Sequence, residues 1–187
     1  MSNVSSNVGV GSAGVIYIAP KGTALPTDAT TALDEAFKEF GFISEDGVTI
    51  SEDTDSESIP SWGGKTVRVE STKYTETVAF TPIECNEVVA RATYGDDAVT
   101  VSQKDGGTLI ATKHGITKTM PAVCVVIDTV ESETTKKRYC AGNAQVTERG
   151  DLEMDGTSAV GRELTYTCNA DAAGVTMYEY AYIVNGA

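Results

Sequence analysis

The segment from residue 160 to 169 alternates between apolar and polar side chains, and this period of two restricts its conformation more than any other feature of the sequence. Leu164, Tyr166 and Cys168 are separated by single threonines. Successive side chains of a β-strand point to opposite faces of a sheet. The pattern therefore predicts a strand with one buried and one solvated face.

Further segments rich in β-branched and aromatic residues indicate that most of the chain is β-sheet. Residues 122–130 are apolar on both faces, which predicts a strand in the centre of a sheet. Residues 14–20 predict a short strand that Pro20 ends. The fold class that follows is mainly β, a largely antiparallel β-sandwich or barrel. Other predicted strands lie around Val48, at 67–80, around Val99 and Leu109, at 139–146 and at 175–184.

Two segments instead carry apolar residues at helical spacing. Residues 25–41 offer Thr27 or Asp28 as a cap and Gly41 as a stop, and residues 83–95 repeat the pattern more briefly. We therefore predict one or two α-helices that flank the sheet. The apolar positions are Leu33, Ala36, Phe37 and Phe40 in the first segment and Ile83, Val88, Val89 and Ala92 in the second.

Length, composition and charge limit the domain organisation and the binding partners that the chain can have. A chain of 187 residues with 41% hydrophobic residues is expected to fold as a single domain spanning residues 1–187, and the small, polar residues 1–14 predict a flexible N-terminal arm. The net charge of -13 argues against tight binding to phosphate backbones. The first twenty residues contain neither a basic region nor a long apolar run, so we expect no signal peptide and no membrane anchor.

The four cysteines are far apart in the sequence and have no metal-ligand spacing. This arrangement favours buried, reduced thiols, with disulfides or a zinc site as the alternatives. The cysteines are Cys85, Cys124, Cys140 and Cys168.

Several motifs resemble catalytic or cofactor sites without the context that such sites need. Residues 9–14 match G-x-G-x-x-G, but no strand precedes them and no helix follows. Residues 151–156 begin like a calcium loop, yet Arg162 replaces the bidentate glutamate. Residues 53–57 also begin a segment that lacks the required calcium-loop residues. The single histidine, His114, has no nucleophile motif to serve and is expected in a turn. We therefore expect no cofactor, no metal site and no enzymatic activity.

The only tryptophan of the chain, Trp62, lies in a segment that does not need it for a core. Residues 56–65 are polar and interrupted by Pro60, Gly63 and Gly64, which predicts a long loop projecting from a hairpin. Trp62 then either contacts another molecule or folds back on its own subunit.

The last predicted strand places three aromatic rings on one face. Burial in the core and a contact between subunits both explain this arrangement. The rings belong to Tyr178, Tyr180 and Tyr182, which alternate with Met177, Glu179 and Ala181.

A series of short motifs follows in order between residues 15 and 100. They are residues 19–26 (APKGTALP), the predicted helix with Leu33 and Phe37, GFISEDGVT, residues 62–64 (WGG) with Val67 and Arg68, IECNEV and YGDD. In this order they resemble the major tail proteins of long-tailed, siphovirus-type bacteriophages, and most of all those from phages of actinobacterial, Gram-positive hosts. Some relatives add an immunoglobulin-like domain, for which we expect no room here.

The resemblance implies a subunit of a phage tail tube. In that family six copies form a ring, rings stack into a hollow tube, and strands of all six subunits join into one barrel around the lumen. The loop at 56–65 would reach neighbouring subunits. Its implied contact residues are Ile59, Pro60, Trp62, Gly63 and Gly64, with Tyr178, Tyr180 and Tyr182 as candidates on the last strand.

The resemblance also gives the acidic charge a role. Duplex DNA carries about one negative charge per 1.7 Å, so an acidic wall lets it slide where a basic wall would hold it. Candidate residues for the lumen or its rim are Glu52, Asp53, Asp55 and Glu57.

The implied partners are further copies of the chain, the tape measure, tail terminator and distal tail proteins, and double-stranded DNA in transit. The implied location is the virion tail, after assembly in the host cytoplasm. A minor or decoration virion protein and a pilus-like β module stay open as alternatives, the latter weakened because the sequence lacks a secretion signal.

Overall fold

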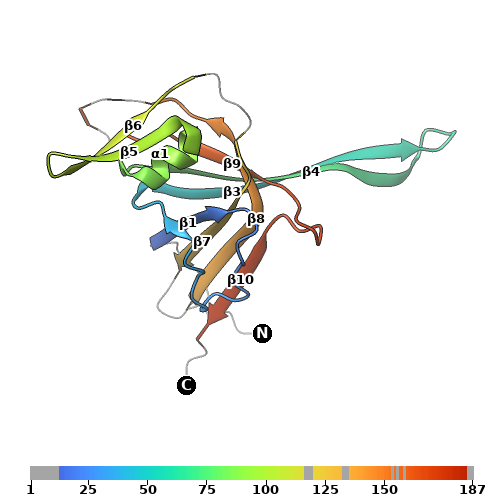
Figure 1. Cartoon of the computed structure of the whole chain (residues 1–187). Helices are drawn as coiled ribbons and strands as arrows, with labels where there is room; N and C mark the ends of the chain where they lie inside the picture. Colours follow the sequence, from blue (N-terminus) through green and yellow to red (C-terminus); the bar gives the residue numbers. More distant parts are fainter. Residues whose placement is uncertain are drawn as a thin grey trace.

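Antiparallel strands make up most of the computed structural model (Figure 1), which describes residues 13–115, 120–131, 135–152, 154, 156–157 and 159–184. The mainly β prediction is confirmed, with one α-helix, α1 (Glu87–Tyr94), and a short 3-10 turn at Asp96–Ala98 among the described residues. The strands are β1 (Ala13–Pro20), β2 (Lys38–Glu39), β3 (Ile43–Pro60), β4 (Thr66–Pro82), β5 (Val99–Lys104), β6 (Gly107–Thr112), β7 (Val123–Val130), β8 (Thr135–Arg149), β9 (Leu164–Cys168) and β10 (Tyr178–Ile183).

Eight strands form one sheet in the order β2-β1-β7-β8-β9-β4-β3, with β10 also paired to β8. The long strand β8 changes partners along its length. Its first part lies between β7 and β10, and from Ala144 onward its partner is β9. Strands β5 and β6 form a separate two-stranded sheet.

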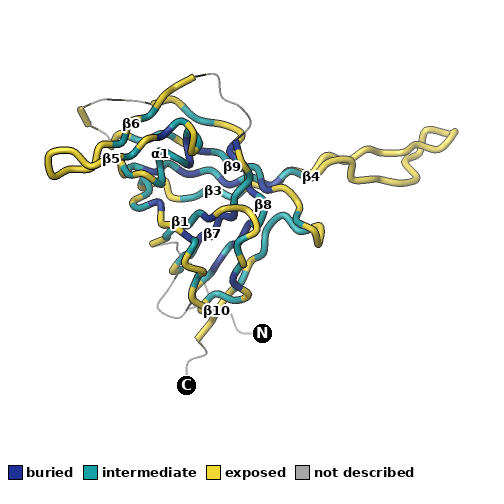
Figure 2. The backbone as a smooth tube through the Cα atoms, in the orientation of Figure 1, coloured by how far each residue is buried: buried dark blue, intermediate teal, exposed yellow. Residues whose placement is uncertain are grey.

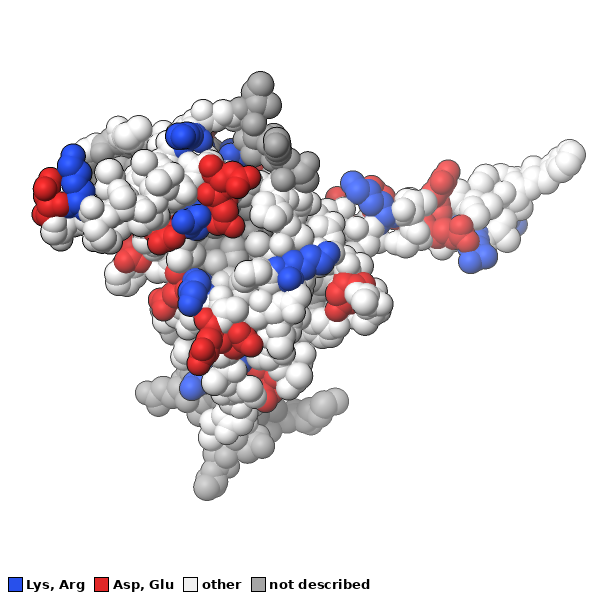
Figure 3. Space-filling view, in the orientation of Figure 1, with Lys and Arg blue, Asp and Glu red and all other residues white. Residues whose placement is uncertain are grey.

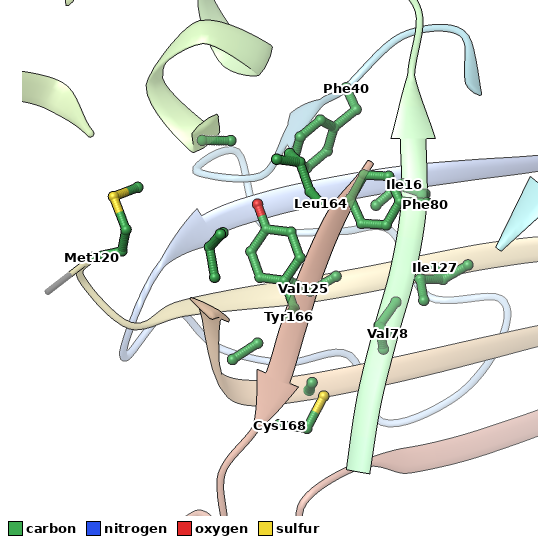
Figure 4. Packing of buried hydrophobic residues seen from close by; sticks show 14 residues of the cluster. Ile16, Phe40, Val78, Phe80, Met120, Val125, Ile127, Leu164, Tyr166 and Cys168 are labelled. Atoms are coloured by element: carbon green, nitrogen blue, oxygen red, sulfur yellow. The ribbon is translucent and has the colours of Figure 1, made fainter. Parts of the chain in front are cut away.

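The main core fills the space between two parts of this sheet. Ile127 of β7 and Ile16 of β1 belong to the same buried cluster as Phe80 of β4 and Tyr166 of β9 (Figure 4). The Phe80 ring stacks on Tyr166 with centroids 5.7 Å apart and meets Phe40 edge-on at 5.0 Å. Burying a side chain of this size contributes about 1.5–3 kcal/mol, so the packing of this cluster stabilises the fold.

Strand β7 is buried on both faces, as its sequence predicts. Val125 and Ile127 face the main core, while Cys124 and Val126 face a second cluster with Phe37 and other residues. A strand in the centre of a covered sheet has no solvated face. This explains why residues 122–130 do not alternate.

The predicted helix at 25–41 is wrong, because this segment is a loop that covers the second cluster and then forms β2. The Asp28 carboxylate accepts hydrogen bonds from the backbone N–H groups of Thr30 and Thr31, each at 2.6 Å. Such a turn offers the backbone an alternative to a helix. The apolar residues of the segment still pack against the sheet: Phe37 is buried in the second cluster, Leu33 and Ala36 are partly buried against it, and Phe40 is buried in the main core.

Arg138 of β8 holds the same loop in place. Its guanidinium donates to the carbonyl oxygens of Asp28 and Thr31 at 3.0 and 2.6 Å, and to both carboxylate oxygens of Asp128. The hydrogen bond to Asp128 raises the pKa of Arg138. Two carbonyl groups that a helix would use internally are therefore bound by a side chain from the sheet.

The second predicted helix is confirmed as α1. The Asn86 side chain caps it by accepting from the N–H of Val89 at 2.9 Å, and its amide nitrogen donates to the carbonyl of Phe40 at 2.8 Å. The helix ends at Gly95, whose φ of 87° suits glycine. The cap therefore also connects α1 to the segment that enters β3.

Three smaller predictions need correction or fall outside the described residues. All four cysteines are free, and Cys85 is exposed instead of buried. Burial raises the pKa of Cys140 and that of Cys168 to about 12, as expected for inert thiols. Ala13 and Gly14, predicted as part of the arm, belong to β1, whereas residues 1–12, with most of the G-x-G-x-x-G motif, lie outside the described residues.

Candidate subunit interface

Strands β3 and β4 continue far beyond the body of the protein as a two-stranded hairpin. Every residue from 51 to 74 is exposed (Figure 2), and we call these residues the hairpin extension. At about 3.4 Å per residue, the outer part of β3 from Ser51 to Pro60 spans about 30 Å. Figure 1 shows the extension leaving the body on the side away from α1.

The prediction of a loop over the whole of residues 56–65 is wrong, because β3 runs on to Pro60 and only residues 61–65 form the turn. Backbone pairing with β4 holds these polar residues in a strand. In the turn, the N–H of Gly64 donates to the carbonyl oxygen of Ser61 at 2.9 Å. The N–H of Ser61 donates to the carbonyl oxygen of Lys65 at 2.7 Å. Gly64 has a φ of 78°, a conformation that favours glycine.

The tip of the hairpin extension is apolar and exposed. Trp62 in the turn has a fully exposed side chain, so it does not fold back on its own subunit. Ile59, Val67 and Val69 on the adjoining strands are also exposed. These side chains contribute nothing to the core of their own chain, which leaves them available to another molecule.

The acidic candidates lie on the β3 side of the extension. Asp55 faces Lys73 across the hairpin, but Glu57 faces Glu70, and like charges directly opposite each other are destabilising. Arg68 offsets part of this repulsion through an exposed ion pair with Glu70 at 2.8 Å. Figure 3 shows acidic and basic groups mixed along the extension.

The remaining two candidates lie nearer the body, again on β3. The hydroxyl of Tyr74 donates to the Glu52 carboxylate at 3.2 Å, and Asp53 is opposite Thr75. The structure thus brings all four acidic candidates onto one exposed strand.

The tyrosines of β10 divide into two groups. Tyr178 and Tyr180 stack with centroids 6.4 Å apart and pack on the second cluster, whereas Tyr182 is 48% exposed. The Tyr178 hydroxyl donates to Asp171 at 2.7 Å, which raises the pKa of Tyr178. The pKa of Asp171 is lowered, first by the N–H of Val175 and then by this hydroxyl. The partly buried pair, Tyr178 and Tyr180, positions β10, and Tyr182 is the most accessible of the three rings.

Three strands of the sheet have a single partner among the described residues. They are β3, which pairs only with β4, β10, which pairs only with β8, and the two-residue β2, which pairs only with β1. An unpaired edge presents N–H and C=O groups that can pair with another chain. The longer edges, those of β3 and β10, are therefore suited to contacts between copies.

His114, which the sequence analysis considered as a catalytic residue, packs against an aromatic ring. His114 stacks on Tyr94 with centroids 4.4 Å apart, and Arg149 and Arg162 approach the same ring at 5.9 and 5.8 Å. Across the described ranges, no group of three or more histidine, cysteine, aspartate or glutamate residues is placed to hold a metal ion. No helix in the described part of the chain has the length and apolar character needed to cross a membrane.

One feature of the body has no signal in the sequence. A cavity of about 270 Å³ lies beside α1, between residues of β1 and residues 120–123, and Tyr166 is among its lining residues. Alternation predicts Tyr166 as a core residue, as found, but cannot predict an unfilled space next to it.

Comparison with known proteins supports one family. A family model described as "Phage tail tube protein" matches residues 1–183. None of the curated proteins matches the chain. Similar solved structures include the anti-feeding prophage baseplate, with a TM-score of 0.46 and 10% identity over 96% of this chain and 97% of that chain.

Two further solved structures are similar. One belongs to the virion of a native gene transfer agent particle, with a TM-score of 0.38 and 12% identity over 81% of this chain and 88% of that one. The other belongs to the PVC sheath-tube complex of an extracellular contractile injection system in the extended state, with a TM-score of 0.42 and 11% identity over 96% of this chain and 99% of that one.

Proposed function

Because the chain belongs to the family of phage tail tube proteins, a family of structural proteins and not of enzymes, we propose that six copies form a ring and that rings stack into a hollow tail tube. The whole chain, residues 1–187, acts as one tube-building unit. The tube carries the phage genome out of the virion. The order of motifs between residues 15 and 100 supports a long-tailed, siphovirus-type phage of an actinobacterial host.

The observation that carries this proposal is the hairpin extension. A two-stranded hairpin in water is marginal by itself, and this one projects from the body with its apolar tip exposed. A protruding element that fits a different surface of the next copy gives a head-to-tail contact, which closes into rings or continues as a helical filament. In this proposal Ile59, Pro60, Trp62, Gly63 and Gly64 contact a neighbouring subunit.

Strand edges supply the contacts within a ring. The unpaired edges of β3 and β10 would be covered when strands of six subunits join into one barrel, which removes the exposed edges of each monomer. Tyr182 lies on β10 with an exposed ring, next to the more buried Tyr178 and Tyr180. These three tyrosines contribute to the same contact.

Carboxylates make the lumen suitable for DNA in transit. Glu52, Asp53, Asp55 and Glu57 would line the lumen or its rim, where their charges repel phosphate groups within about 8 Å at physiological salt. A wall that does not bind phosphate lets the duplex slide. The tape measure, tail terminator and distal tail proteins would meet the same tube in the virion, after its assembly in the host cytoplasm.

Electron microscopy of the purified protein at rising concentration tests the proposal. We expect hollow, evenly striated tubes with six-fold end views. A matched control removes residues 54–74 and joins Asp53 to Thr75, which are opposite each other in the hairpin, by an Asn-Gly turn. This variant should fold but form no tubes. Compact monomers of the full chain at every concentration and salt would contradict the proposal.

A further inference from the structure

One carboxylate is buried where the hairpin extension begins. Along β4, the side chains of Phe80, Val78 and Glu76 alternate with more accessible residues and face inward. Figure 4 shows Val78 and Phe80 in the core. Glu76 is only 5% exposed, whereas Tyr74, the next residue on this face, is 48% exposed and belongs to the extension. A charged side chain therefore ends an otherwise apolar row.

Pairing with the rest of the sheet also ends at Glu76. Strand β4 pairs with β9 from Phe80 to Glu76, which is opposite Cys168, and beyond this point β3 is its partner among the described residues. Every residue of the extension is exposed, so packing on the body does not hold it. A two-stranded ribbon is more strongly twisted and less stable by itself than a wider sheet. The direction of the extension therefore depends on contacts at its root.

The neighbours of Glu76 across the sheet bring no positive charge. Glu52 lies directly opposite it on β3, and like charges in this arrangement are destabilising. Within the described ranges, neither lysine nor arginine forms an ion pair with Glu76. On the other side, burial and then the charge of Glu76 raise the pKa of the Cys168 thiol. A buried charge of this kind needs hydrogen bonds to compensate for its lost hydration.

A hydrogen bond to Glu76 comes from a distant part of the chain. The hydroxyl of Thr176 donates to the Glu76 carboxylate across 100 residues of sequence. Thr176 lies between β9 and β10, and Figure 1 shows this segment beside the point where β3 and β4 leave the body. The next residue, Met177, packs against the main core, and Tyr178 begins β10. The donor is therefore held by the body, and the bond connects the root of the extension to the start of β10.

We propose that Glu76 is a positioning residue, whose hydrogen bond with Thr176 fixes the direction of the hairpin extension relative to β10. An apolar side chain at this position would lengthen the core, but a hydrogen bond to a carboxylate also restricts direction. The consequence for assembly rests on the proposed tube function, because the tip of the extension and the edge of β10 are the two contacts offered to other copies. An element that is fixed before docking loses less conformational freedom when it docks. Glu76 therefore promotes assembly.

Pulsed electron paramagnetic resonance on the unassembled chain tests this position directly. Spin labels are attached to Gly63→Cys at the tip and to Ala181→Cys on β10, in a Cys85→Ser background that removes the exposed native thiol. A side chain at Gly63 meets no atom within 4 Å, and Ala181 is exposed. The width of the distance distribution then reports how firmly the extension is held.

Two substitutions of Thr176 separate the hydrogen bond from packing. Thr176→Val keeps the shape but removes the hydroxyl, and Thr176→Ser keeps the hydroxyl but removes a methyl group. We expect the labelled parent and Thr176→Ser to give the same narrow distribution, and Thr176→Val to give a broader one. Equal distributions for all three chains, or broadening in Thr176→Ser alone, would overturn the proposal.

A matched control lies next to Glu76 on β4. Thr77→Val also removes a threonine hydroxyl, but from a side chain that points to the opposite face of the strand. It should leave the distribution narrow, and broadening as large as that of Thr176→Val would contradict the proposal. If Thr176→Val does not fold, Glu76→Gln is added to remove the unpartnered charge. This double variant should give a broader distribution than Glu76→Gln alone, whose amide oxygen can still accept from Thr176, and equal widths would overturn the proposal.

Assembly of the unlabelled chains measures the consequence. Thr176→Val should raise the critical concentration for tubes about fivefold, the effect of about one lost hydrogen bond, while Thr176→Ser should not change it. An unchanged critical concentration for Thr176→Val would overturn the link to assembly. Failure of the parent to form tubes would overturn the proposed function instead, and the distances in the unassembled chain would still decide the role of Glu76.

Discussion

At the scale of a single residue, substitution of Trp62 is expected to affect assembly without affecting the stability of the monomer. Its side chain is fully exposed in the subunit, so Trp62→Ala should change the free energy of unfolding of the monomer by less than about 0.5 kcal/mol. Tubes should fail to form, since truncating a central tryptophan of an interface typically costs 2 kcal/mol or more. Thermal melting and microscopy of the same sample measure the two effects. A variant that melts far below the parent, or that assembles normally, contradicts the prediction.

Asp28 makes the loop over the second cluster sensitive to acid. Its pKa is lowered, first by the hydroxyl of Thr31 and then by the backbone and hydroxyl hydrogen bonds of Thr30 and Thr31. A carboxyl with a lowered pKa in the folded state stabilises the fold above its unfolded pKa of about 3.9. This stabilisation is lost as the pH falls below about 4.

The corresponding prediction compares Asp28→Asn with the parent in unfolding experiments between about pH 5 and pH 2. The variant should lose less stability over this interval, because its amide does not titrate. Asp97→Asn serves as the control, since the described residues show no such set of hydrogen bonds to Asp97. Equal slopes for parent and Asp28→Asn would contradict the prediction.

Burial of individual residues is what the sequence predicted best. The alternation in β9 identified Leu164, Tyr166 and Cys168 as buried. In segment 25–41 Phe37 and Phe40 are buried as well, although the segment is not a helix. The tyrosines of β10 show the limit of this approach. Alternation places Tyr178, Tyr180 and Tyr182 on one face of the strand but does not predict how deeply each is buried. Tyr178 and Tyr180 pack inward while Tyr182 is half exposed, because the second cluster ends between them.

At the scale of elements, helix α1 depends on Asn86 for two hydrogen bonds with different roles. In Asn86→Ala, loss of the cap should lower the free energy of unfolding by about 1 kcal/mol. The total loss should be larger, because the Phe40 carbonyl also loses its donor. Asn86→Asp should recover the cap but not the second bond. Chemical denaturation of both variants measures the difference, and equal stability of Asn86→Ala and the parent would contradict the prediction.

Element type was predictable where local signals and packing agree. The helix α1 has a cap, an apolar face and a terminal glycine, and the structure keeps all three. In segment 25–41 the apolar spacing fits a helix, but the side chains of Asp28 and Arg138 bind the backbone in another conformation. In residues 56–60 the composition suggests a loop, yet pairing with β4 extends the strand.

For the whole molecule, the net charge of -13 on each subunit opposes assembly. Copies of one sign repel each other, and salt screens this repulsion. Raising the ionic strength should therefore promote tube formation from soluble subunits. Light scattering against salt concentration, with sucrose at equal osmolality as a control, measures the effect. Scattering that decreases as salt increases would contradict the prediction.

The order of the strands in the sheet could not be predicted from the sequence. A mainly β, antiparallel fold followed from alternation, and β7 was expected near the centre. The insertion of β9 between β8 and β4 depends on long-range pairing, on which local patterns carry no information. The cavity beside α1 was unpredictable for the same reason, since its lining comes from β1, β2, α1, β8, β9 and residues 120–123.

The pairing of β1 with β7 also determines when the subunit can fold during its synthesis. Ile16 is opposite Ile127, so the ribosome must add more than a hundred residues before β1 can meet its partner. At about 5–20 residues per second this takes roughly 5–20 seconds. The hairpin of β3 and β4, which is local in sequence, is complete well before that. The residues of the hairpin extension are therefore synthesised before the core of their own chain can form.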